Sequence, residues 1–265
     1  VQELYIDSNI NISENEQVEF SNKEIHLNAH INCEGSISFY NCHIYYGEKI
    51  NKINLKNNST MTIDQCIITC TGIPEGFFIN SDSCNSDIEM KNSRVENSVN
   101  LLSGCYKRLK INSNEFNNYF TNTIDISNCE EVEIKNNLFV NIDIPFQFEA
   151  DNHFLSIWAN SGVFENNILK ESDVIADYFS DDSTTTYKID LGRNIKASNC
   201  SFFGMKFCIS ASDIRDCVFE NCRKILNTWR LKKIVIKNCT FTECSSICKA
   251  DNFDISMCRF EKCYD

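Results

Sequence analysis

The chain has 265 residues, of which 42% are hydrophobic and 23% are charged, an ordinary balance for a globular protein. Its formal net charge of −12 argues against extended contact with nucleic acid or an anionic membrane, because phosphates are bound through clustered Lys and Arg. Gly (8) and Pro (2) are scarce, whereas Asn is abundant and readily adopts left-handed backbone conformations. We therefore expect one domain, residues 1–265, whose tight turns use Asn in place of Gly.

Residues 1–36 alternate between apolar and polar positions, as strands with one buried face do. They do not match the repeat found further along the chain, so we expect irregular first rungs that cover the N-terminal end. The segment also lacks the basic stretch and the apolar core of a signal peptide. No apolar run approaches the roughly 18 residues needed to cross a bilayer. A cytoplasmic protein without a membrane span is expected, or a secreted one if a leader was removed.

One pattern then recurs to the C-terminal end: alternating apolar residues, a residue that is often Asn, a small or polar anchor, and an apolar residue two positions later. Its copies are FYNCHI (39–44), IDQCII (63–68), MKNSRV (90–95), INSNEF (111–116), IKNNLF (134–139), ANSGVF (159–164), ASNCSF (197–202), IRDCVF (214–219), IKNCTF (236–241) and ISMCRF (255–260). The anchors recur about every 22 residues, with one spacing of 38. Such a rung holds two or three short strands, and stacked rungs pair in parallel about 4.8 Å apart. The sequence predicts an all-β, right-handed parallel β-helix (solenoid) of about ten to twelve rungs.

Residues at equal positions of the repeat should then lie directly above one another. The residues three before the anchor and two after it are apolar and should face the interior. The position two after the anchor should form a stacked aromatic ladder of Phe116, Phe139, Phe164, Phe202, Phe219, Phe241 and Phe260. The Asn before the anchor should lie at the bend between two strands, where its amide can hydrogen-bond from rung to rung.

From about residue 37 to residue 263, this pattern resembles the generic repeat of the pectate-lyase-like superfamily of right-handed parallel β-helices. The resemblance implies the fold. It does not select a function, because that superfamily contains hydrolases, lyases, epimerases, adhesins and scaffold modules.

The sixteen Cys follow the repeat. Many occupy the anchor position, and a second column lies five residues later, at Cys222, Cys244 and Cys263. We interpret them as free thiols packed in the interior, which favours a reducing compartment. Disulfides between rungs are the alternative. A metal site is not expected, because no Cys-x-x-Cys pair occurs and the Cys pairs follow the rungs. No cofactor is expected either.

The long spacing marks an insertion or an irregular rung at residues 170–194, with Asp177, Asp181 and Asp182 as candidate catalytic carboxylates. Paired carboxyls flanking a sugar bond would support a polysaccharide hydrolase or lyase that acts on an acidic glycan. The Gly-His-Gly segment expected of related glycosidases is missing. The alternative is an extra rung with a solvated loop.

One basic stretch contains Arg223, Arg230, Lys232 and Lys233 around Trp229. Clustered cations beside an indole ring suit an anionic polymer. The alternative is a solvated charged face.

The repeat runs to Cys263 without a capping segment, which would leave an unpaired strand edge. We therefore expect a longer protein, or a protein partner or flanking domain docked at the C-terminal end. The leading hypothesis is a non-catalytic binding or scaffold β-helix module within a larger assembly.

Overall fold

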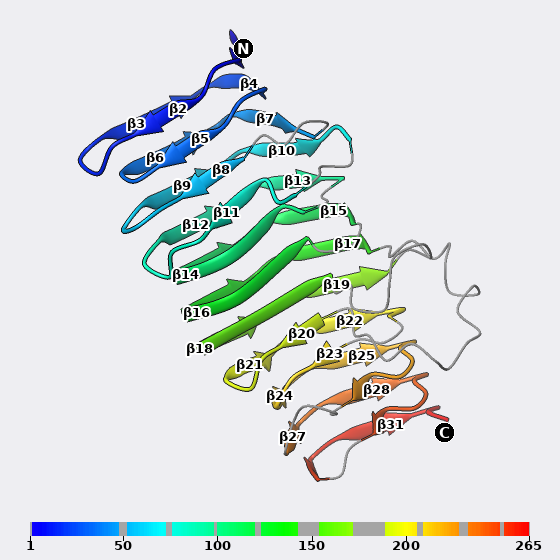
Figure 1. The fold of residues 1–265 in the computed structure, drawn as a ribbon. Helices are drawn as coiled ribbons and strands as arrows, with labels where there is room; N and C mark the ends of the chain where they lie inside the picture. Colours follow the sequence, from blue (N-terminus) through cyan, green and yellow to red (C-terminus); the bar gives the residue numbers. More distant parts are fainter. Residues whose placement is uncertain are drawn as a thin grey trace.

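The computed structural model describes residues 2–47, 52–72, 76–97, 100–119, 123–142, 154–171, 189–205, 209–227, 233–249 and 252–264. In these ranges the backbone forms strands joined by turns, without a helix, and every strand pairing is parallel. The turns stack in chain order from the N-terminal end to the C-terminal end (Figure 1). The predicted all-β parallel solenoid is confirmed.

The last strand of each turn belongs to one sheet, which we call sheet A. Its members, in order of pairing, are β1 (Gln2–Ile6), β4 (Lys23–Leu27), β7 (His43–Tyr46), β10 (Ile67–Cys70), β13 (Arg94–Glu96), β15 (Glu115–Tyr119), β17 (Leu138–Ile142), β19 (Ile168–Glu171), β22 (Ser201–Phe203), β25 (Val218–Glu220), β28 (Thr240–Thr242) and β31 (Arg259–Glu261). Twelve strands along this face agree with the predicted ten to twelve rungs.

The other strands form sheet B, which has two columns. The first column holds β2 (Ile10–Ile12), β5 (Ile31–Cys33), β8 (Ile53–Leu55), β11 (Ile79–Ser81), β20 (Ile189–Leu191), β23 (Ile209–Ser210), β26 (Leu226–Asn227) and β29 (Cys248–Lys249). The second holds β3 (Gln17–Ser21), β6 (Ser36–Tyr40), β9 (Thr60–Asp64), β12 (Asp87–Lys91), β21 (Ile195–Ser198), β24 (Asp213–Arg215), β27 (Ile234–Lys237) and β30 (Phe253–Ser256). Three long strands run through both columns: β14 (Leu102–Asn112), β16 (Ile124–Lys135) and β18 (Leu155–Glu165).

The first turns belong to the same stack. Strand β1 pairs with β4, β2 pairs with β5, and β3 pairs with β6, all in register. Residues 2–36 therefore occupy the same three columns as the rest of the chain.

The bend between sheet B and sheet A uses left-handed backbone, as the Asn content predicts. Eleven residues at this bend have φ between 49° and 59°: Asn22, Asn41, Gln65, Asn92, Ser113, Asn136, Asn166, Asn199, Asp216, Asn238 and Met257. Seven of the eleven are Asn, whose short polar side chain tolerates this conformation better than other non-Gly residues. Asn amides also join successive turns, as Asn41 Nδ2 does to Asn22 Oδ1 (2.7 Å). The predicted bonds from turn to turn are confirmed at Asn41, Asn92, Asn166 and Asn238, whose amides donate to Asn or Asp of the preceding turn.

The interior of sheet A holds the aromatic ladder in two segments. Phe116 and Phe139 stack with ring centroids 4.7 Å apart. A second run stacks at 4.7, 4.9 and 5.0 Å and contains Phe202, Phe219, Phe241 and Phe260. All of these rings except Phe260 are fully buried. Full burial of one such ring contributes roughly 1.5–3 kcal/mol, so the ladder is a major source of stability.

The predicted place of Phe164 in this ladder is wrong. Phe164 pairs with Ile134 and Ala197 in sheet B, whereas Leu169 lies between Phe139 and Phe202 in sheet A. The sixth copy of the repeat is therefore FENNIL (164–169), and its anchor is Asn167, not Gly162. The anchor spacings on either side of this copy, from Asn137 to Asn167 and from Asn167 to Cys200, become 30 and 33 residues. The single predicted spacing of 38 residues is thus replaced by two moderately long turns.

Candidate binding face on the outside of sheet A

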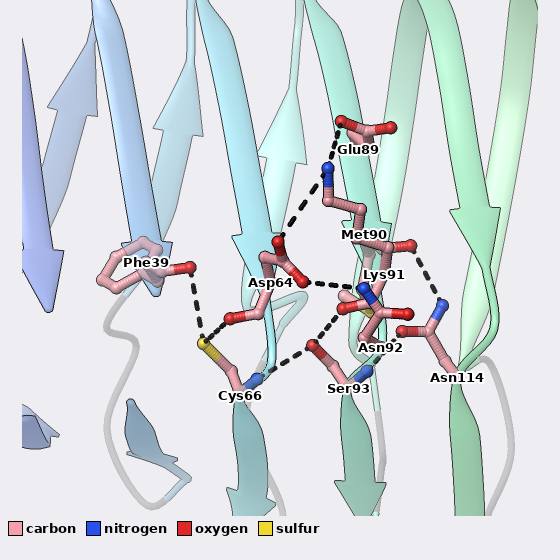
Figure 2. A network of polar contacts seen from close by, with 9 residues as sticks. All are labelled: Phe39, Asp64, Cys66, Glu89, Met90, Lys91, Asn92, Ser93 and Asn114. Carbon is pink, nitrogen blue, oxygen red and sulfur yellow. Dashed lines mark hydrogen bonds and ion pairs between the residues drawn. The ribbon is translucent and has the colours of Figure 1, made fainter. Parts of the chain in front are cut away.

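The anchor residues form a buried polar ladder along the bend (Figure 2). The Cys66 amide donates to Ser93 Oγ (3.0 Å), and the Ser93 amide donates to Asn114 Oδ1 (3.0 Å). The ladder continues in the same way. The Asn114 amide donates to Asn137 Oδ1 (2.9 Å), and the Asn137 amide donates to Asn167 Oδ1 (3.0 Å). Each anchor thus accepts from the amide of the anchor one turn earlier. These polar side chains satisfy buried backbone groups, which is a structural role.

The same side chains also donate to carbonyl groups of the preceding turn. Asn114 Nδ2 donates to the Met90 carbonyl (3.0 Å), and the Cys66 thiol makes the equivalent contact to the Phe39 carbonyl (3.5 Å). Figure 2 shows both contacts. Ser93 Oγ donates instead to the Lys91 carbonyl of its own turn (2.7 Å). Cys, Ser and Asn thus share this position, and each supplies a small donor to a nearby carbonyl.

The cysteines of the described residues support the packing interpretation. The side chains of fourteen are described, and none of these forms a disulfide. Burial raises the pKa of the Cys33, Cys66 and Cys129 thiols to about 11. Thiols with such pKa values hold their protons at neutral pH and are poor nucleophiles and metal ligands.

Most of the predicted site residues lie outside the described ranges. These are Asp177, Asp181 and Asp182 of the insertion and Trp229, Arg230 and Lys232 of the basic stretch. Two members of the basic stretch are described, and both are exposed: Arg223 follows β25, and Lys233 directly precedes β27. They lie at different corners of the solenoid, one after a sheet A strand and one between the two columns of sheet B.

A band of apolar side chains lies on the outer face of sheet A, where polar residues are expected. One row runs through Leu138, Ile168, Ser201 and Val218, which occupy equal positions of β17, β19, β22 and β25. Ile168 is 45% exposed and Val218 is 38% exposed. Figure 1 shows these four strands side by side in the middle of the stack.

A second row runs parallel to the first. It contains Val140, Lys170, Phe203 and Glu220 on the same four strands. Val140 and Phe203 are partly buried, and their inward neighbours are the ladder residues Phe139 and Phe202. The apolar members of the two rows are Leu138, Val140, Ile168, Phe203 and Val218, which we call the outer apolar band. Ser201, Lys170 and Glu220 lie between them.

Charged pairs lie on sheet A to both sides of this band. Toward the N-terminal end, Arg94 contacts Glu96 (3.1 Å) and Glu115 (3.8 Å) on strands β13 and β15. Toward the C-terminal end, Arg259 pairs with Glu261 on β31. An apolar centre flanked by charged side chains is the usual arrangement of a protein-binding surface.

Aromatic and imidazole rings stack on the first turns of the same outer face. The Tyr5, His26 and Tyr45 rings lie 4.6 and 4.8 Å apart along the solenoid axis. The Tyr45 hydroxyl contacts His43 Nδ1 (3.0 Å), and His43 Nε2 contacts Thr69 Oγ1 (3.0 Å). Partial burial lowers the pKa of His43, so the neutral ring is favoured near neutral pH. The neutral ring can donate through one nitrogen and accept through the other, which suits a hydrogen-bonded polar relay.

Neither outer feature was identified from the sequence, although each carries a signal. Leu138, Ile168 and Val218 each follow an anchor residue directly, a position that faces outward. Tyr5 and His26 lie 21 residues apart, which is one turn. A search of the outward positions for apolar or aromatic residues one turn apart would have found both.

The last turn also exposes side chains that are interior elsewhere. Phe260 is 47% exposed, whereas its neighbour Phe241 is fully buried. Phe253 of the same turn is 51% exposed, whereas its register partner Ile234 is fully buried. Met257 is 80% exposed at the bend position, which also faces solvent in earlier turns. Docking of a partner or flanking domain on this end stays a prediction.

No protein-family model matches the chain, and no curated protein matches it. The structure shows a parallel β-solenoid, and the resemblance to the pectate-lyase-like superfamily stays a prediction from the repeat. Within the described ranges, no helix is long and apolar enough to cross a membrane. The described His, Cys, Asp and Glu side chains form no cluster of three or more that could hold a metal ion.

Proposed function

We propose that this chain is a non-catalytic binding module that docks a protein partner on the outer face of sheet A. The observation that carries the proposal is the outer apolar band on strands β17, β19, β22 and β25. Apolar side chains gathered on the outside of a folded domain, here interleaved with polar ones, mark interaction surfaces because their exposure to water is unfavourable.

The rigidity of the solenoid supports this function. Each outer residue of the band stands on a strand that is hydrogen-bonded on both sides, so its position is fixed before binding. A pre-organised surface loses little conformational entropy when a partner docks. The polar anchor residues at the bend have a structural role, because they satisfy buried backbone groups. The outer face of sheet A is left free for binding.

A site-specific photo-crosslinking experiment tests the proposal. A photoreactive amino acid is placed at position 168 or 218, and at position 196 as the control, in the cells that produce the protein. Lys196 is exposed and faces outward from β21 in sheet B. We expect one protein adduct from positions 168 and 218 and none from position 196.

A charge substitution gives the matched control. Ile168→Asp should abolish the adduct formed from position 218, because burial of an unpaired carboxylate is strongly unfavourable. Lys196→Asp should leave it intact, and circular dichroism and the thermal midpoint should be unchanged in both variants. Equal adducts from all three positions, or none at 168 and 218, would contradict the proposal.

The other hypotheses depend on residues outside the described ranges. Cleavage of an acidic glycan rests on Asp177, Asp181 and Asp182, and release of reducing sugar from acidic polysaccharides tests it. Binding of an anionic polymer rests on the stretch around Trp229, and salt-dependent binding to heparin tests it.

A further inference from the structure

Two partly exposed cysteines lie near one another on neighbouring turns. Cys84 lies in the turn between β11 and β12, and Cys105 lies one turn later, in strand β14. Asp87 of β12 pairs with Arg108 of β14, and each cysteine precedes its member of this pair by three residues. The two thiols are close enough to influence one another, since Cys105 raises the pKa of the Cys84 thiol. Neighbouring turns of a parallel stack are about 4.8 Å apart, a spacing that a disulfide can bridge.

Two residues of the next turn, in strand β16, contact the two thiols. Asn128 Nδ2 donates to Cys84 Sγ (3.6 Å), and Cys105 Sγ contacts Ser127 Oγ (3.6 Å). Asn128 is also the register partner of Cys105 across the bulge that follows Gly104. The pairing of the two thiols is therefore part of a defined arrangement over three turns.

Access to solvent separates this pair from the stacked cysteines of the interior. Cys84 and Cys105 are partly exposed, and Ser127 and Asn128 beside them are exposed. Cys217, which represents the anchor column, is 1% exposed, and its thiol points to interior carbonyl groups. A dissolved oxidant can reach the outer pair without unfolding of the chain, whereas it cannot reach a thiol inside the coil.

We propose that Cys84 and Cys105 are a redox site that forms a reversible disulfide between neighbouring turns. The oxidant is a low-molecular-weight disulfide such as oxidised glutathione. One cysteine loses its proton to solvent, and its thiolate attacks one sulfur of the small disulfide, whose S–S bond breaks. The first small thiolate leaves and takes up a proton.

The second cysteine then completes the reaction. It loses its proton, and its thiolate attacks the protein sulfur of the mixed disulfide, which releases the second small thiol. The two protein thiols supply two electrons, so one small disulfide becomes two small thiols. Excess reduced thiol reverses both steps. The bond closes a loop around the turn between β11 and β12 and ties this turn to β14.

The neighbouring Cys105 thiol raises the pKa of Cys84, so its thiolate is scarce at neutral pH. Because the thiolate is the attacking species, formation of the bond should become faster as the pH rises.

Peptide mapping tests the proposal. The folded, reduced protein is incubated with oxidised glutathione, quenched with acid, alkylated and digested. We expect a peptide pair joined through Cys84 and Cys105, lighter than the separate peptides by two hydrogens, and its loss after dithiothreitol. Amide exchange at Ser86 and Asp87 should be slower in the oxidised protein, and exchange in β27 should be unchanged.

Two variants sharpen the test. Cys84→Ser should stop at the mixed disulfide of Cys105 with glutathione, whereas Cys217→Ser, in the buried column, should leave the Cys84–Cys105 bond unchanged. The proposal is overturned if both thiols stay reduced during the incubation and are therefore alkylated afterwards. It is equally overturned if Cys84 or Cys105 forms a disulfide with a different cysteine. It is also overturned if the bond forms only after the chain is unfolded.

Discussion

The buried Asn of the anchor ladder should be indispensable to the middle of the solenoid, and Asn137→Ala tests this. Asn137 is 1% exposed. Its Oδ1 accepts from the Asn114 amide (2.9 Å) and from Asn114 Nδ2 (3.1 Å), and its Nδ2 donates to the Ile111 carbonyl (2.8 Å). The substitution removes these bonds and the one from Asn137 Nδ2 to Asn167 Oδ1 (3.0 Å). It leaves the Asn114 amide and the Ile111 carbonyl without their side-chain partner inside the coil.

An unsatisfied buried polar group costs about 1–3 kcal/mol, and water can reach part of the space left by the side chain. We therefore expect Asn137→Ala to lower the free energy of unfolding by about 3–5 kcal/mol. Urea denaturation followed by circular dichroism measures this loss, and native-state hydrogen exchange at the Asn114 amide shows whether it is local.

Two comparisons identify the cause. Asn32→Ala removes an Asn that also bonds from turn to turn, to Asn11 (2.9 Å) and Asn54 (3.0 Å), but on the outer face. Water replaces those bonds, so the loss should stay below about 1 kcal/mol. Asn137→Cys should recover part of the stability, since Cys200 occupies the equivalent position and its thiol donates to the Phe164 carbonyl (3.4 Å). If Asn137→Ala costs no more than Asn32→Ala, the reasoning about the buried ladder is refuted.

Three further predictions follow from the same structure. Phe219→Ala empties a fully buried position of the aromatic ladder and should lower the free energy of unfolding, measured by urea denaturation, by about 3–5 kcal/mol. A loss below about 1 kcal/mol would show that the ladder is not a major source of stability. Gly104→Ala places a Cβ 2.1 Å from the Ser81 carbonyl oxygen at a φ of +111°. It should therefore lower the thermal midpoint far more than Gly204→Ala, because at Gly204 φ is +65° and the added Cβ would meet nothing within 4 Å. Equal shifts of the thermal midpoint would be inconsistent with a close approach at Gly104. His43 has a lowered pKa in the folded chain, so the unfolded chain is protonated first as the pH falls. The stability contributed by this group is therefore present above the ordinary His pKa of about 6.5 and is lost as the pH falls below it. His43→Gln should flatten the acid limb of stability against pH in denaturation curves, and an unchanged limb would exclude this contribution.

The repeat made the architecture predictable because each turn shows the same local chemistry. Asn41, Asn92 and Asn238 mark the bend, since few residues other than Gly adopt left-handed backbone at low cost. The apolar residues three before the anchor alternate with outward polar residues, and this alternation identifies the buried side of each strand. The stack of Phe202, Phe219 and Phe241 follows from the period alone.

Two turns escaped the pattern for identifiable reasons. In FSNKEI (20–25), Lys23 occupies the anchor position, so the first bend carries no small or thiol residue to recognise. In the sixth copy, ANSGVF and FENNIL both alternate, and Phe164 and Leu169 are both buried and apolar. Local alternation cannot choose between them, because the choice depends on which residues pair with the neighbouring turns.

The candidate binding face was visible only as scattered residues. Ile168 and Val218 are unremarkable singly, and they become one surface because β19 and β25 are brought to the same side of the stack, two strands apart. The hypotheses that rest on Asp177, Asp181, Asp182 and Trp229 stay predictions, since those residues lie outside the described ranges.

The amino-acid sequence by itself determined the period, the bends and the inward and outward sides, because backbone preference and hydrophobic alternation act within a few residues. The tertiary structure decided the register of each turn against the next. Register places Cys84 beside Cys105 and Leu138 beside Ile168, and it is set by hydrogen bonds between residues a full turn apart. Contacts over that separation depend on the combined length of every strand and bend between them, which no local pattern specifies.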